Sequence, residues 1–323
     1  MSRETIVRNL LEKYGINDQR TTQWHTKRST MITASEVTKA FRKATPAARL
    51  ELLLRKIEGA KPGDGSSTNA ACAWGNQFEP IAKRIYCRMN GGGDIVDTTC
   101  VVHPTVPFLG ASPDGIYCPP SKDDPRWGKL VEFKCPISRK VDPSLPIPYE
   151  YYHQMQLQME CTGIHECDYA EMKFVTIPRS EWNKSNAPYK GRFAIYDSGE
   201  ISYDFDTLPT WMASLKEKDD EYRVVHWELQ NSRLEAVPKD PHWLQTYLPD
   251  LTEFWDEVIH HRTHGTVPIK PEKVIETIQC EPPTTPPDAP SVPLPEVAAN
   301  PVTEDDSSSV HKKNPTTLTF DFA

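Results

Sequence analysis

The sequence contains no run of about 18 apolar residues, so no segment of it is suited to cross a membrane as a helix. Its first residues, MSRETIVRNLLEKYG, lack the apolar core and the small-residue cleavage site of a signal peptide. The eight cysteines include no CxxC pair, which argues against a zinc knuckle and against a disulfide framework. We therefore expect a soluble, intracellular protein with reduced thiols.

A surplus of positive charge is also lacking, because the formal net charge of the 323 residues is −8. Phosphate contacts supply much of the affinity of a DNA-binding protein, so this balance is unusual for one. The charge is unevenly distributed, however. Residues 1–62 hold thirteen Lys or Arg and six Asp or Glu, whereas residues 268–323 hold four and nine. The body of the chain is therefore compatible with a DNA substrate.

Residues 268–323 contain eleven of the thirty prolines and few bulky apolar side chains. Such a segment buries too little surface to offset the entropy lost on ordering, so we predict a disordered tail. Its last residues, 316–323, read TTLTFDFA and are either a short docking motif for a protein partner or a chance apolar end. Residues 1–267 are then predicted to form one main domain.

The pattern of apolar residues in the main domain predicts helices mixed with short strands. Apolar side chains three and four residues apart predict helices at about 2–14, 36–43, 46–58, 70–90, 149–163, 208–222 and 241–264. Strand-like runs occur at 94–102, 108–112, 114–118, 129–135, 169–177, 192–197 and 201–205. This order favours an α/β fold in which a sheet is flanked by helices.

Two neighbouring motifs carry residues suited to metal chemistry. Asp114 lies in the motif SPDG, and Glu132, Phe133 and Lys134 follow on the next predicted strand. Residues two apart on a strand share a face, so Glu132 and Lys134 project together while Phe133 enters the core. Pairing of the two strands would bring Asp114 to the same pocket, where two carboxylates form an oxygen site suited to Mg²⁺ or Mn²⁺. A surface salt bridge is the alternative, although a carboxylate within the apolar run LVEFKCP is costly without a partner or a metal ion.

The spacing from Pro113 and Asp114 to Glu132 and Lys134 matches the PD-(D/E)xK nucleases. More specifically, the chain resembles the lambda exonuclease group, also called YqaJ-like viral recombinases, in five motifs that occur in order between about residues 24 and 175. The motifs are Arg28 with Thr33-Ala34-Ser35, Trp74-Gly75 with Glu79, Ser112-Pro113-Asp114-Gly115, Glu132 with Lys134-Cys135-Pro136, and Tyr151 with Gln154, Gln156 and Met159. The resemblance implies a restriction-endonuclease-like core, a central mixed sheet flanked by helices, within residues 1–267.

A metal site is the first consequence of this resemblance. Asp114 and Glu132 would ligate a pair of Mg²⁺ ions with help from the Phe133 carbonyl, and Mn²⁺ would substitute. Glu79 would complete the site directly or through water, the alternative being a solvated position on its helix. Lys134 would position the attacking water. We expect such a site to hydrolyse DNA phosphodiesters by in-line attack.

The resemblance implies that three further side chains contact either Lys134 or the DNA. Gln154 would orient the region of the lysine or the DNA, against the alternative of an ordinary polar helix position. Arg28 and Ser35 would hold a phosphate near the 5′ end, because arginine offers a bidentate fork and Ser35 lies near a predicted helix start. Ser35 as a plain helix-start residue is the alternative. The histidines within 260–264 are a weaker metal candidate, since histidine is common at helix C-termini.

Together the motifs predict a Mg²⁺-dependent deoxyribonuclease. The resemblance implies a 5′-to-3′ exonuclease that acts on double-stranded DNA ends in viral recombination or DNA processing, located in the host cytoplasm or nucleus. Members of this group can form rings around DNA, so a homo-oligomer is a further expectation. A structure-selective or restriction-like endonuclease is the first alternative. The second is a non-catalytic DNA-binding or interaction module, although the carboxylates needed for catalysis are present.

Overall fold

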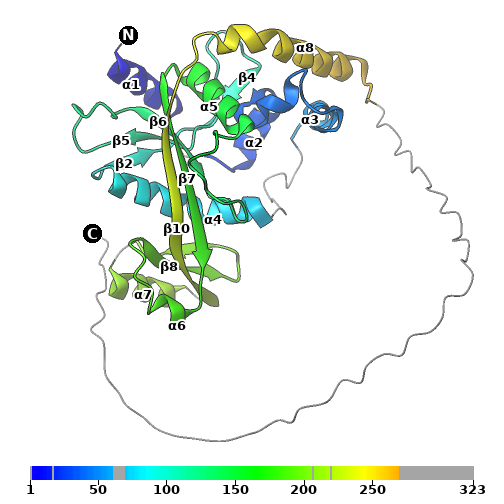
Figure 1. Cartoon of the computed structure of the whole chain (residues 1–323). Helices are drawn as coiled ribbons and strands as arrows, with labels where there is room; N and C mark the ends of the chain where they lie inside the picture. The colour runs from blue at the N-terminus through cyan, green and yellow to red at the C-terminus, as the bar shows by residue number, and fades with distance from the viewer. Residues whose placement is uncertain (1, 17, 61–69, 206, 219, 269–323) are drawn as a thin grey trace, which may run out of the picture. The chain divides into compact units, whose positions relative to one another are not determined.

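The computed structural model describes residues 2–16, 18–60, 70–205, 207–218 and 220–268 (Figure 1). These residues belong to one compact unit that runs from Met1 to Lys270. The predicted disordered tail lies outside the described residues apart from Pro268, and so does the docking motif predicted at 316–323. None of the described helices is long and apolar enough to cross a membrane.

A seven-stranded sheet forms the centre of the unit, with the strand order β2-β5-β6-β7-β10-β8-β9. Its strands are β2 (Asp94–Val96), β5 (Gly115–Cys118), β6 (Lys129–Lys134), β7 (Glu166–Thr176), β10 (Tyr222–Pro238), β8 (Lys190–Tyr196) and β9 (Ile201–Tyr203). Strands β6 and β7 run parallel, and the other neighbours run antiparallel. The predicted mixed sheet is therefore confirmed. A second, small sheet contains β1 (Ile32–Thr33), β4 (Leu109–Ala111) and β3 (Val101–Val102).

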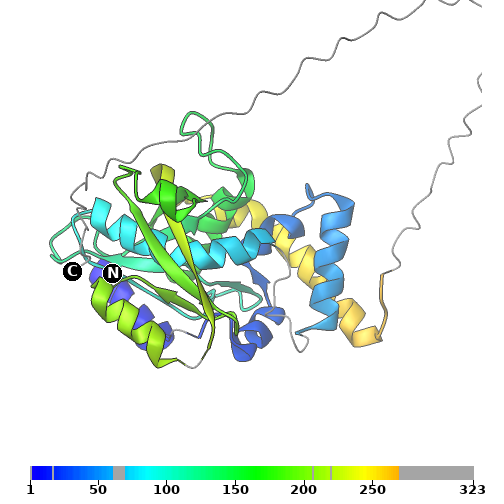
Figure 2. The same cartoon turned by 90° about the horizontal axis from the view of Figure 1, so that it is seen from below.

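Helices cover both faces of the large sheet (Figure 1 and Figure 2). They are α1 (Arg3–Tyr14), α2 (Thr22–Ser29), the 3-10 helix η1 (Ala34–Ala40), α3 (Pro46–Glu58), α4 (Ala70–Met89), α5 (Tyr149–Thr162), α6 (Arg179–Trp182), α7 (Leu208–Glu217) and α8 (Trp243–His264). Alternate residues of β6 enter two different apolar cores: Val131 and Phe133 share one with α4, and Leu130 shares the other with α5. The alternation places Glu132 and Lys134 on the face that α5 covers.

Helix α4 forms as its sequence predicts, with Phe78 and Ile81 among its buried residues. Phe78 stacks on Phe174 of β7, with 4.6 Å between the ring centroids. The glycines after the helix end it, and Gly91 takes a φ of 89°, which residues with a side chain rarely adopt. Burial of Phe78 fixes the direction of its neighbour Glu79 on the helix surface.

The structure differs from the sequence prediction at several elements. The helix expected over 36–43 is instead the shorter 3-10 helix η1, and the helix expected over 208–222 ends at Glu217. Helix α2 and strand β10 are absent from the prediction. Strand β10 exposes most of its side chains and so lacks the alternation that marks a half-buried strand, yet its backbone pairs with β7 on one edge and β8 on the other.

We predict that Phe78→Ala lowers the free energy of unfolding by about 3–5 kcal/mol, because it opens a cavity between α4 and the sheet. Leu234→Ala is the control, since Leu234 on β10 is 43% exposed. It should change stability by less than about 0.5 kcal/mol. Urea unfolding of the two variants and the wild type measures both values, and equal losses would contradict the assignment of Phe78 to the core.

Candidate active site

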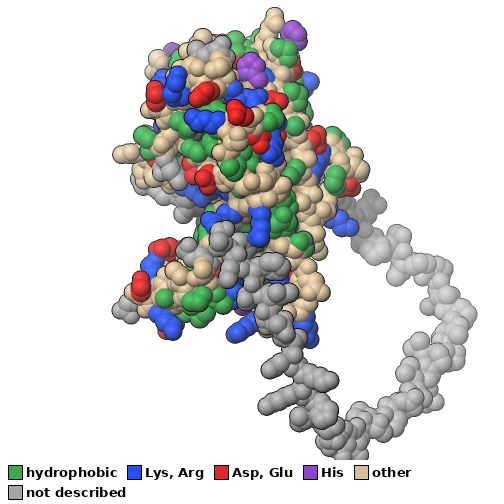
Figure 3. Space-filling model, turned by 90° about the vertical axis from the view of Figure 1, so that its left-hand side faces the viewer, with side chains coloured by type: hydrophobic (Ala, Val, Ile, Leu, Met, Phe, Trp, Pro, Cys, Tyr) green, Lys and Arg blue, Asp and Glu red, His purple; other side chains and the backbone are tan. Residues whose placement is uncertain are grey.

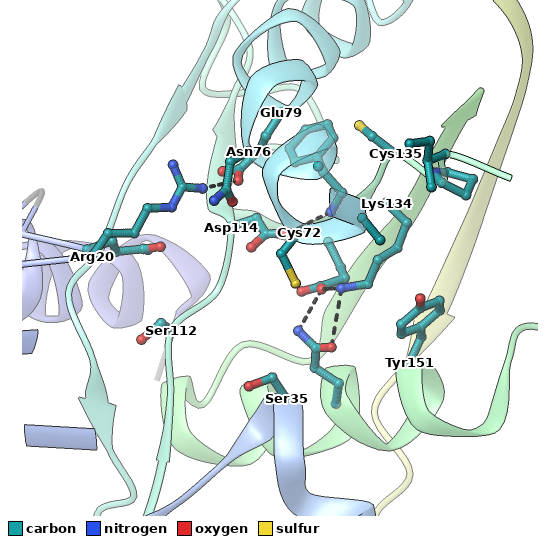
Figure 4. Close-up of a pocket in the computed structure, with 18 of the residues that line it drawn as sticks. Arg20, Ser35, Cys72, Asn76, Glu79, Ser112, Asp114, Lys134, Cys135 and Tyr151 are labelled. Atoms are coloured by element: carbon teal, nitrogen blue, oxygen red, sulfur yellow. Dashed lines mark hydrogen bonds and ion pairs between the residues drawn. The ribbon is translucent and has the colours of Figure 1, made fainter. Parts of the chain in front are cut away.

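One pocket of about 530 Å³ is lined by all the residues that the sequence predicts for the site (Figure 4). These are Arg28, Ser35, Glu79, Asp114, Glu132, Phe133, Lys134 and Gln154. They come from α2, η1, α4, the turn into β5, strand β6 and α5. The fold therefore brings together side chains that are more than a hundred positions apart in the sequence.

The β5–β6 hairpin places the two predicted carboxylates in the pocket. Gly115 pairs with Val131, so Asp114 lies at the end of β5 beside the last residues of β6. Asp114 Oδ2 accepts a hydrogen bond from the backbone N–H of Phe133 at 2.8 Å. This bond fixes Asp114 against β6, and it involves the amide group of Phe133 rather than the carbonyl that the resemblance assigns to a metal ion.

Glu132 forms an ion pair with Lys134, but it is completely buried, so the pair is not a surface salt bridge. Its Oε1 accepts hydrogen bonds from Lys134 Nζ and from Gln154 Nε2, the latter at 2.6 Å. Its Oε2 accepts one from Gln158 Nε2 at 2.6 Å. Gln154 also accepts from Lys134 Nζ at 3.3 Å, and the ammonium group lies 4.5 Å from the centre of the Tyr151 ring. The three donors hold the carboxylate in one orientation.

Gln158 is a site residue that the sequence interpretation missed. It lies one helical turn after Gln154 on α5 and is fully buried. The spacing of four residues places both amides on the same helix face, and this spacing could have identified Gln158 once Gln154 was chosen.

Arg28 and Ser35 meet at the other side of the pocket. Arg28 Nη2 donates to Ser35 Oγ at 3.0 Å, and the guanidinium stacks on Trp24 at 4.1 Å from the ring centre. Trp24 Nε1 in turn donates to Ser112 Oγ at 3.0 Å. Because α2 carries both Trp24 and Arg28, this unpredicted helix orients the arginine fork toward the pocket.

A buried acid lies behind Arg28. Glu36 accepts a hydrogen bond from the N–H of Thr33 at 2.9 Å, as part of a capping box at the start of η1. It also pairs with the ammonium of Lys56 and, at 2.6 Å, with Arg55. Burial acts to raise the pKa of Glu36, but Lys56, Arg55 and Arg28 outweigh it and lower the pKa. The cluster of Glu36 with Arg28, Arg55 and Lys56 therefore carries more positive than negative charge.

Glu79 is held at the mouth of the pocket by two basic groups. Arg20 Nη2 lies 2.6 Å from Glu79 Oε2 (Figure 4). Lys83 Nζ lies 3.0 Å from Glu79 Oε1. The sequence interpretation does not include Arg20. Its contact joins two segments 59 positions apart and has no sequence signal.

The part of the chain that carries this arrangement is similar to a known protein family. The family model of the YqaJ-like viral recombinase domain matches residues 23–165. On the basis of this match, residues 23–165 are called the YqaJ-like domain below. This segment contains every residue that the sequence predicts for the site.

The chain is similar to proteins of viruses and bacteria. It is 22% identical to an uncharacterised protein of Acanthamoeba polyphaga mimivirus over 84% of this chain, and it spans 58% of that protein's length. An alkaline exonuclease from Laribacter hongkongensis is 22% identical, with a TM-score of 0.48 over 76% of this chain and 95% of that one. A phage-related exonuclease from Haemophilus somnus is 12% identical, with a TM-score of 0.42 over 73% and 96%.

The YqaJ-like domain concentrates negative charge around Asp114. Burial raises the pKa of Asp114 well above the usual range, and repulsion from Glu132 and Glu79 raises it further. Burial acts to lower the pKa of Lys134, but the attraction of Glu132 and Asp114 outweighs this and raises it. Lys134 is therefore an ammonium group at neutral pH, and the attraction of Lys134 and Lys83 offsets only part of the rise in the pKa of Asp114.

The donor set fits a divalent cation in chemistry, because three carboxylates line one pocket and repel one another. Among the described residues, however, no three Asp, Glu, His or Cys side chains, the histidines within 260–264 included, are grouped so that they could hold an ion. Glu132 is held by α5, and Glu79 is held by Arg20 and Lys83. A cation shared by all three carboxylates would require Glu79 to leave a basic partner.

We predict that Asp114→Asn stabilises the cation-free protein by about 1 kcal/mol at pH 7.5. A raised pKa means that the ionised carboxylate destabilises the fold above that pKa. The amide removes this charge and can still accept from Phe133 N–H. The gain should shrink as the pH falls toward about 4, the ordinary pKa of an aspartate in the unfolded chain.

Urea unfolding with a chelator at several pH values measures this effect. Asp123→Asn is the control, since Asp123 is an exposed residue between β5 and β6 and should give no gain. A loss of stability in Asp114→Asn at pH 7.5 would contradict the charge repulsion inferred at Asp114.

Proposed function

We propose that the YqaJ-like domain is a Mg²⁺-dependent deoxyribonuclease that degrades double-stranded DNA from 5′ ends. The observation that carries the proposal is the meeting of Asp114, Glu132 and Lys134 in one pocket with the Arg28–Ser35 pair. Carboxylates beside an ammonium group suit phosphodiester hydrolysis, and an arginine fork suits a phosphate. The viral relative and the family's name support a role in viral DNA recombination.

The chain's own residues divide the work in this proposal. Asp114, Glu132 and Glu79 would hold Mg²⁺, with Mn²⁺ as a substitute. When bound, the ions would polarise the phosphodiester and lower the pKa of the attacking water. Glu132 and Asp114 raise the pKa of Lys134, which favours its ammonium form over a form that takes a proton from the water. Lys134 instead orients the water and stabilises the negative charge that develops on the phosphate oxygens.

The basic side chains that we propose for DNA binding line the pocket. On the face shown in Figure 3, basic and acidic side chains lie interspersed, which does not favour extensive contact with a duplex. The pocket instead presents Arg20, Arg28, Lys134 and Arg139. Arg28 and Ser35 would take the 5′ phosphate, and this contact would give the enzyme its polarity.

Digestion of two substrates tests the proposal. With Mg²⁺ the protein should degrade a linear duplex and leave a covalently closed circle intact, and a chelator should abolish degradation. A linear duplex with 5′ phosphates should be degraded faster than one with 5′ hydroxyls, because Arg28 forms charge-assisted hydrogen bonds with a terminal phosphate. Cutting of the circle would favour a structure-selective endonuclease, and intact DNA in every reaction would favour a non-catalytic DNA-binding module.

We predict that Lys134→Gln lowers the cleavage rate by about 10²- to 10³-fold, because the transition state loses its fixed positive charge. Lys129→Gln is the matched control. Lys129 begins the same strand and lies 3.7 Å from Asp168, outside the pocket. Single-turnover digestion with Mg²⁺ compares the two variants, and a Lys134→Gln enzyme as fast as the Lys129→Gln enzyme would refute the role of Lys134.

A further inference from the structure

Arg20 occupies an unusual backbone conformation at the edge of the pocket. Its φ of 72° lies in the left-handed region, and it is the non-glycine residue with this property in the described part of the chain. It belongs to the turn before α2, in which the N–H of Thr21 donates to Asp18 O at 3.1 Å. Such a conformation persists only where surrounding contacts fix it.

Neighbouring contacts fix this turn beside Asp114. Gln19 Nε2 donates to Thr98 O at 2.8 Å and to Pro113 O at 3.1 Å, and Trp24 binds Ser112 on the other side of the turn. The turn therefore lies against the backbone immediately before Asp114. Arg20 extends from it toward Glu79 (Figure 4).

The two basic partners of Glu79 are not equivalent. Lys83 is 19% exposed and also pairs with Asp97 at 2.8 Å, so it has a second carboxylate to balance its charge. Arg20 is 49% exposed, and its side chain can move without burying an unpaired charge. Arg20 is therefore the partner that Glu79 can release more easily.

We propose that Arg20 exchanges its partner when the pocket takes up a divalent cation. In the cation-free protein it neutralises Glu79. When a cation binds among Asp114, Glu132 and Glu79, Arg20 is repelled and its guanidinium binds a backbone phosphate of the DNA in the same pocket. The inference rests on the proposed function, and it makes Arg20 a substrate-binding residue that couples cation uptake to DNA binding.

The geometry and charge both favour this exchange. Arg20 lines the same pocket as Lys134 and Asp114, so a phosphate brought to the carboxylates lies within the region that its side chain can sweep. A guanidinium binds phosphate through two parallel hydrogen bonds, as it binds a carboxylate. The cation that Glu79 then holds replaces the charge that Arg20 withdraws.

Calorimetry with Mg²⁺ alone tests the first half of the exchange. Arg20→Asn should bind Mg²⁺ about two- to fivefold more tightly than the wild type, because no arginine competes for Glu79. Asparagine tolerates a positive φ, so the turn is retained. Arg42→Asn is the matched control: Arg42 pairs with Glu253 at 2.5 Å on the surface, and its loss should leave Mg²⁺ binding unchanged.

The salt dependence of DNA binding tests the second half. Duplex binding is measured with Ca²⁺ in place of Mg²⁺, and gels confirm that the DNA stays intact. The slope of log affinity against log salt concentration should be steeper for the wild type than for Arg20→Asn. The slopes should differ by about 0.9, the value for one phosphate contact. With a chelator the two slopes should be equal, because Arg20 then stays on Glu79.

Glu79→Gln removes the other partner of the ion pair and tests the same exchange. Without the carboxylate, Arg20 is available to the phosphate in the absence of any cation, so this variant should show the steeper slope even with a chelator. Equal slopes for all variants in all conditions, or weaker Mg²⁺ binding by Arg20→Asn, would overturn the exchange. Failure of the wild type itself to bind Mg²⁺ or degrade DNA would instead overturn the proposed function.

Discussion

The carboxylate of Glu132 lies within the central sheet, where no part of it reaches solvent, and much of the site follows from this burial. An ionised carboxylate in such a place is tolerated only when the protein supplies hydrogen-bond donors or opposite charge. Lys134 supplies the charge, and Gln154 and Gln158 supply amides from α5. Compensation of this one acid therefore connects Lys134 of β6 with the two glutamines of α5.

Spacing alone predicts the part of the site that lies within single elements. Glu132 and Lys134 share a face because a strand has a period of two, and hairpin pairing adds Asp114. Arg28 and Ser35 could be chosen through motifs of a known family, but their contact depends on how α2 packs. Arg20 could not be predicted, because its contact needs a left-handed turn and a helix 59 positions away.

The fold was predictable where burial leaves a pattern in the sequence. Helix α4 shows its apolar stripe, and the apolar run in β6 marks a strand at the centre of the sheet. Strand β10 shows neither pattern. Three of its seventeen side chains are buried, those of Trp227, Arg233 and Val237, while its backbone pairs with β7 and β8. Sequence periodicity reports side-chain burial, so it gives a weak signal for a strand that buries few side chains.

Asp114 and Glu132 are both carboxylates in one pocket, but they differ in the hydrogen-bond donors and positive charge that surround them. Glu132 receives three donors, one of them charged, whereas the contact of Asp114 that the hairpin provides is a single backbone N–H. The greater demand for positive charge therefore lies at Asp114, whose ionised form Glu132 and Glu79 both repel. In the exchange that we propose, a cation bound there would meet a carboxylate already paired with Arg20. The imbalance that would attract the cation would then also release the arginine for a phosphate.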